Sequence, residues 1–177
     1  MIAVSPDSAP AHHGGAPAAL LDGAIAGTVG GVVFLLWGLG VDLVERRDPL
    51  GFAWVPAAVI DRVVLATARV LSPAEAAIAG ALLVIPACAA IGALVTWLLT
   101  LTRRAPTWGV TLTASFAALQ LAFFAFDGAT GGGLFGRMRP WSVLAANALA
   151  ACAITLILLL RQPRLSEGRR DLWDDEP

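Results

Sequence analysis

The residues best suited to chemistry in this 177-residue chain gather where its apolar runs end. Asp42 closes the first run, Asp127 closes the third, and arginines follow both; the set is Asp42, Arg46, Arg47, Asp127, Arg137 and Arg139. If the runs span a membrane, all six residues lie near one membrane face. Guanidinium groups suit phosphates and carboxylates, and the glycine-rich connection 127–139 offers backbone amides to an anion. The set is therefore a candidate site for a lipid headgroup, although such charges also mark where helices meet water and can pair with one another.

Two amide side chains are the strongest polar groups inside the runs. Gln120 lies six residues before Phe126, which ends the third run, and Asn147 lies seven residues after Pro140, which begins the fourth. These ends share a face, so both amides lie about 9 to 10 Å below it. We predict a hydrogen bond between Gln120 and Asn147; a polar substrate site is the alternative.

Several chemistries lack the residues that they need. No Asp, Glu, Lys, Arg or His falls in the middle of a run, and such residues carry ion relays and haem ligation. His12 and His13 lie near the amino terminus, and Cys88 and Cys152 have no CxxC or His neighbours. The 12 basic residues, all arginine, balance 13 acidic ones, which offers no basic stripe for nucleic acid. We expect no catalytic residue, no metal, no cofactor and no nucleic-acid partner.

The composition is that of a membrane protein. Apolar residues make up 58% of the chain and charged residues 14%, against roughly 25% charged in soluble domains. Four runs are long enough to cross about 30 Å of hydrocarbon as helices; the predicted spans are 23–44, 73–102, 106–127 and 140–161. The predicted fold is an all-α integral membrane protein, with four transmembrane helices in an antiparallel bundle plus one interfacial amphipathic helix.

The remaining segments have distinct patterns. Residues 1–19 predict a disordered tail and 162–177 a polar tail. Residues 57–71 place apolar side chains opposite Asp61, Arg62 and Arg69, which predicts the interfacial helix. Ser72-Pro73-Ala74-Glu75 predicts a capping box that opens the second span.

Small residues mark the predicted packing faces of the first two spans. Gly23, Gly27 and Gly31 form a GxxxGxxxG pattern, and the second span carries Gly80 and Gly92. These faces fit either packing within the bundle or contact with another subunit. Five of the six tryptophans predict the two membrane faces, with Trp97 and Trp108 at one and Trp37, Trp54 and Trp141 at the opposite one. Arginines divide six to six between the two sides, so orientation stays open.

The segment Trp37-Gly-Leu-Gly-Val-Asp42, followed by a basic turn with a proline, resembles many small four-helix bacterial membrane proteins of unknown function. The resemblance covers about the first third of the chain and implies no activity. We expect a non-catalytic accessory or scaffold subunit of a larger assembly in the bacterial cytoplasmic membrane, with lipids and other subunits or copies as partners. The first alternative is a small homo-oligomeric transporter or channel, whose pore between copies is lined by Thr28, Thr111, Thr113, Ser115, Gln120 and Asn147. The second is an enzyme that acts on lipid headgroups at Asp127 and Arg139.

Overall fold

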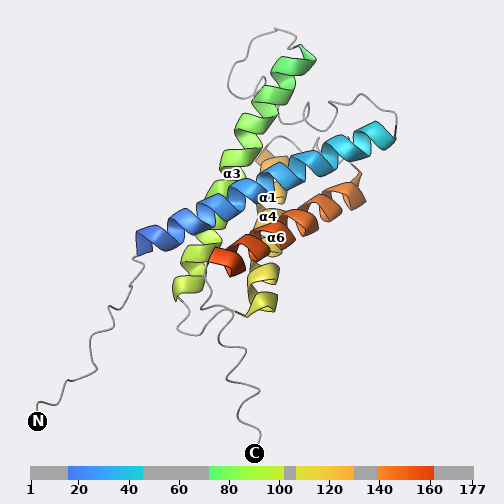
Figure 1. Ribbon diagram of the computed structural model, residues 1–177. Helices are drawn as coiled ribbons and strands as arrows, with labels where there is room; N and C mark the ends of the chain where they lie inside the picture. The colour runs from blue at the N-terminus through green and yellow to red at the C-terminus, as the bar shows by residue number, and fades with distance from the viewer. Residues whose placement is uncertain (1–15, 46–71, 102–106, 130–138, 162–177) are drawn as a thin grey trace, which may run out of the picture.

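The computed structural model describes residues 16–45, 72–101, 107–129 and 139–161, and four helices account for nearly all of them (Figure 1). They are α1 (Ala16–Val44), α3 (Pro73–Leu101), α4 (Trp108–Ala129) and α6 (Pro140–Arg161). Each is long and apolar enough to cross a membrane. The all-helical, four-span fold is thereby confirmed. The predicted interfacial helix at 57–71 lies outside the described residues, as does the polar tail 162–177.

Most helix boundaries agree with the predicted spans, and α1 is the exception. It begins at Ala16, whereas the sequence analysis assigned residues up to 19 to a disordered tail and began the span at Gly23. Alanine and leucine between 16 and 21 are strong helix formers, and Pro17 falls in the first turn, where its missing N–H breaks no hydrogen bond. The structure therefore corrects the tail at residues 16–19. α4 is shifted by two residues, to Trp108–Ala129.

The start of α3 has the predicted capping box. The backbone N–H of Ser72 donates to Glu75 Oε2 over 2.8 Å. The N–H of Glu75 donates to Ser72 Oγ over 3.4 Å. These two bonds satisfy donors that a helix amino terminus leaves without partners. From this start α3 continues for 29 residues through Pro86.

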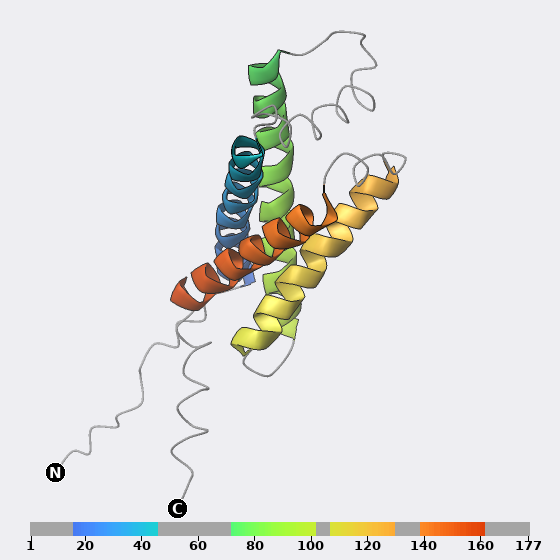
Figure 2. The same cartoon turned by 90° about the vertical axis from the view of Figure 1, so that its right-hand side faces the viewer.

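The four helices run alternately up and down (Figures 1 and 2). We define the lower end as the one that holds Ala16, Leu101, Trp108 and Arg161, and the upper end as the one that holds Val44, Pro73, Ala129 and Pro140. α1 lies between α3 and α6, while α4 packs against α6 and, less extensively, against α3. Each helix therefore has two neighbours, and the order around the bundle is α3, α1, α6, α4.

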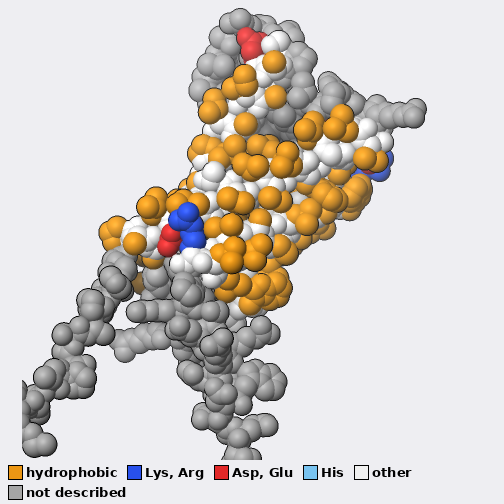
Figure 3. Space-filling view, viewed as in Figure 1, with side chains coloured by type: hydrophobic (Ala, Val, Ile, Leu, Met, Phe, Trp, Pro, Cys, Tyr) orange, Lys and Arg blue, Asp and Glu red, His pale blue; other side chains and the backbone are white. Residues whose placement is uncertain are grey.

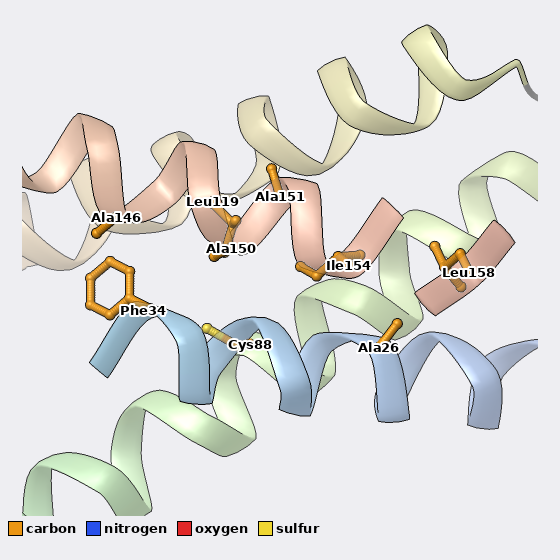
Figure 4. Close-up of a cluster of buried hydrophobic side chains, with 9 residues drawn as sticks. All are labelled: Ala26, Phe34, Cys88, Leu119, Ala146, Ala150, Ala151, Ile154 and Leu158. Atoms are coloured by element: carbon orange, nitrogen blue, oxygen red, sulfur yellow. The ribbon is translucent and has the colours of Figure 1, made fainter. Parts of the chain in front are cut away.

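The core lies between α6 and its neighbours α1 and α4, and Cys88 joins it from α3 (Figure 4). Most of its side chains come from α6: Ala146, Ala150, Ala151, Ile154 and Leu158. Three of these five are alanines. Ala146, Ala150, Ala151 and Ile154 are all 0% exposed. The outer surface between the two ends is mainly apolar (Figure 3), as a surface that faces lipid tails must be.

Candidate functional site

The glycine face of α1 is in contact with α3. A β-carbon at Gly23 would lie 2.6 Å from the carbonyl oxygen of Gly92, and one at Gly27 would lie 2.8 Å from Ala89 Cα. On α3, a β-carbon at Gly92 would lie 2.8 Å from Gly27 Cα. The two backbones thus approach as closely as glycine allows. Gly31 meets Cys88 and Ile85 in the same way, and Gly80 is buried on α3.

This crossing uses the predicted packing residues within the chain. The sequence allowed these glycines to pack either within the bundle or against another subunit. In the structure, the glycines of α1 pack against α3 of the same molecule. A second subunit cannot occupy the same face. Any surface for assembly must therefore lie elsewhere on the bundle.

Two ion pairs join α1 to α6, one at each end of the bundle. At the lower end Arg161 Nη1 lies 3.0 Å from Asp22 Oδ1. At the upper end Arg139 Nη1 lies 3.1 Å from Glu45 Oε1. The 23 steps from Asp22 to Glu45 rise about 35 Å along a helix, which exceeds the hydrocarbon thickness of about 30 Å by an amount that tilt accommodates. The distance between the two pairs thus suits ion pairs at the two surfaces of a membrane.

The candidate headgroup set is only partly described by the structure. Arg46, Arg47 and Arg137 lie outside the described residues. Asp42 and Asp127 are half-buried at the upper end, and Arg139 already has Glu45 as its partner. The sequence analysis missed Glu45 and the Asp22 to Arg161 pair. The signal was present in the sequence, because acidic residues lie at both ends of the first span and arginines at both ends of the last. It could have been used if the first span had been extended toward the amino terminus to include Asp22.

The predicted amides come together between α4 and α6. Asn147 Nδ2 donates a hydrogen bond to Gln120 Oε1. Asn147 is 2% exposed, and Gln120 is half-buried. This bond fixes the relative height of the two antiparallel helices, because it joins points at the same depth.

Replacing Gln120 by leucine should weaken the α4 to α6 contact by about 0.6 kcal/mol and by no more than about 2. The reason is that Asn147 would keep its amide buried without this acceptor. Unfolding in detergent should be measured for Gln120→Leu, Asn147→Leu and the double variant. Thr113→Val, on the exposed face of α4, serves as the control. Additive effects of the two leucine changes would contradict an energetic link between the amides.

Hydroxyl groups in the helices fall into two classes. Thr28, Thr96 and Thr111 donate to the carbonyl four residues earlier, over 2.9, 2.9 and 3.2 Å. Ser115, Ser142 and Thr155 are buried, yet their hydroxyls have no hydrogen-bond partner among the described residues. An unpaired buried hydroxyl costs roughly 1 to 3 kcal/mol. α4 buries Thr111, Ser115 and Leu119, so two of its three buried side chains carry a hydroxyl.

Apart from Gln120, which is half-buried, the residues predicted to line a pore between copies separate into two groups. Thr28 and Thr113 are exposed on the outside of the bundle. Thr111, Ser115 and Asn147 are at most 2% exposed and lie inside one molecule. Residues enclosed in one bundle cannot line a channel between two bundles. This geometry disfavours the particular pore that the sequence suggested.

Of the four tryptophans that the structure describes, three lie near the predicted ends of the bundle. Trp97 and Trp108 are exposed near the lower end and Trp141 near the upper end, while Trp54 lies outside the described residues. Trp37 instead packs against the core. Its Nε1 is buried, with no hydrogen-bond partner in the described part of the chain.

Within the described ranges, no group of three His, Cys, Asp or Glu residues could hold a metal ion. Both cysteines are free, Cys88 being buried and Cys152 exposed. In comparisons with known proteins, the chain matches no protein-family model, no curated protein and no solved structure.

Proposed function

We propose that the protein is a non-catalytic accessory or scaffold subunit that binds a transmembrane helix of another membrane protein through the outer face of α4. One observation carries this proposal: α4 has a row of exposed small residues of the kind that α1 uses to bind α3. The row steps by four residues through Gly109, Thr113 and Ala117, and continues beyond Leu121 with Ala125. Small residues at this spacing let two helix backbones approach closely.

The small-residue face of α1 is covered by α3, whereas the small-residue row of α4 is exposed. A β-carbon at Gly27 would meet α3 backbone atoms at 2.8 Å. At Gly109, and at Gly128 farther along α4, a β-carbon would meet nothing within 4 Å. There is thus room for a further helix beside both of these glycines of α4.

The inner face of α4 supports the same proposal. α4 buries three side chains within the described bundle, whereas α6 buries nine. A helix held by few internal contacts keeps most of its surface for a neighbour. Because lipid tails are as apolar as leucine, close backbone contact between helices has to supply the affinity.

The proposed setting is the cytoplasmic membrane of a bacterium, on the basis of the resemblance of residues 37–42 to small bacterial four-helix proteins. The proposed partner is an unlike subunit, and lipids cover the remaining apolar surface. A second copy of this chain on α4 would instead favour the homo-oligomeric alternative.

Replacing Ala117 by phenylalanine should reduce partner recovery about tenfold, which corresponds to roughly 1.4 kcal/mol, because the ring would keep the helix backbones apart. The measurement is native mass spectrometry of the full chain purified from its own membranes in mild detergent. Ala90→Phe is the matched control, since Ala90 is also an exposed alanine near the middle of its helix, on α3.

The outcomes separate the alternatives. Unlike subunits in fixed ratio, lost with Ala117→Phe and kept with Ala90→Phe, support the accessory role. A symmetric homomer that depends on Ala117 replaces that role with self-association. A monomer before substitution, or equal losses with both variants, contradicts the use of α4 as the binding face.

A further inference from the structure

Two buried hydroxyls on facing helices have no partner in the protein. Ser115 on α4 and Thr155 on α6 are both 0% exposed. Neither Ser115 Oγ nor Thr155 Oγ1 has a hydrogen-bond partner among the described residues. Thr111, one turn from Ser115 on the same helix, donates to the carbonyl of Thr107 over 3.2 Å and is therefore satisfied. Ser115 is thus the buried hydroxyl of α4 that lacks a partner among the described residues, while on α6 Ser142 shares this lack with Thr155.

The relative height of the helices brings the two hydroxyls to the same region. Leu119 of α4 lies beside Ala150 and Ala151 of α6 (Figure 4). The helices are antiparallel, so a step of four residues toward the lower end leads from Leu119 to Ser115 and from Ala151 to Thr155. Each step is about 6 Å. Ser115 and Thr155 thus lie at similar height on two packed helices, one turn below the cluster that holds Leu119 and Ala151.

We propose that Ser115 and Thr155 together hold a water molecule at lipid depth between α4 and α6. Buried waters typically make about three hydrogen bonds to groups that would otherwise be unsatisfied, and each of these hydroxyls can both donate and accept. A neutral occupant fits this site because no charged group is available to balance an ion. Among the described residues, no Asp, Glu, Arg or His lies near Ser115 or Thr155 in the region between the two ion pairs. The site is on the inner face of α4 and is independent of the proposed partner on its outer face.

The direct test is water-to-methyl magnetisation transfer by NMR, on the full chain in detergent with threonine methyl labels. The Thr155 methyl should show a cross-peak to water that the Thr113 methyl lacks. Thr113 is the matched control, because it is exposed to detergent tails on the same helix, two residues from Ser115. Ser115→Ala should abolish the Thr155 cross-peak.

The stability of the variants is a second test, because a bridged hydroxyl and an unpaired hydroxyl predict changes in opposite directions. If a water joins the two hydroxyls, Ser115→Ala and the nearly isosteric Thr155→Val should each lower the folding equilibrium constant about fivefold, and the double variant should lose little more. Thr113→Ala should change it little. A rise with Ser115→Ala would mean that the hydroxyl is unpaired, and would overturn the proposal.

The remaining outcomes are equally decisive. A loss of stability without any water cross-peak would indicate a direct bond between Ser115 and Thr155, with no water. A cross-peak at Thr155 that survives Ser115→Ala would place the water on other groups. Either result overturns the two-residue site.

Discussion

Replacing Gly27 by leucine should separate α1 from α3 and lower the free energy of unfolding by roughly 3 kcal/mol or more, the upper part of the range for overpacked sites. Even the first added carbon would lie 2.8 Å from both Ala89 Cα and the carbonyl carbon of Cys88. These are backbone atoms of a helix, which cannot rotate away as a side chain can. Relief therefore requires the two helices to move apart along their whole crossing.

The measurement is unfolding of the purified chain in mixed detergent micelles, followed by helix content and tryptophan emission. Gly109→Leu is the matched control, because nothing lies within 4 Å of a β-carbon at that position. The control should change stability by no more than about 0.5 kcal/mol. Equal stability of the two variants would show that the α1 to α3 crossing is not the tight contact described above.

Replacing Ile154 by alanine should lower the free energy of unfolding by roughly 2 to 3 kcal/mol, toward the lower end of the values for emptied core sites. Ile154 is 0% exposed and reaches over Gly30 of α1, where a β-carbon would lie 2.7 Å from Ile154 Cγ1. The loss is one of van der Waals contacts, because burial from lipid gains no hydrophobic energy.

The same contact allows a size exchange. Gly30→Ala alone should be destabilising, since its methyl group would press on Ile154. Combined with Ile154→Ala it should recover part of the loss, because the new methyl group fills space that the isoleucine leaves. The four proteins form a double-mutant cycle in the same unfolding assay. Strictly additive effects would be inconsistent with a direct contact between positions 30 and 154.

The spans could be predicted because a bilayer leaves few choices. Backbone groups in lipid must pair within a helix, so each long apolar run had to be one, and α6 begins and ends where the sequence predicts. The depth of Gln120 and Asn147 followed from helical rise alone. The start of α1 was harder to predict because residues 16–19 are Ala and Pro, which continue a tail rich in the same residues, although the helix includes them.

Side-chain partners were harder to predict because they depend on the order of helices around the bundle. The short connection between the second and third spans made them neighbours, but no local pattern tells which span flanks the first. That choice pairs Arg161 with Asp22 and Arg139 with Glu45. It also turns Trp37 toward the core, whereas its sequence position near the end of a span suggested the membrane surface.

The pairing of α1 with α6 has a consequence for biosynthesis. The ribosome makes α1 before α6, so the contact that closes the bundle cannot form until α6 has been made. Until then Asp22 lacks its Arg161 counterion and the cleft beside Gly30 lacks Ile154. The α1 to α3 crossing needs only the chain up to the end of α3. The order of synthesis thus allows α1 and α3 to pair through their glycines before α6 joins them.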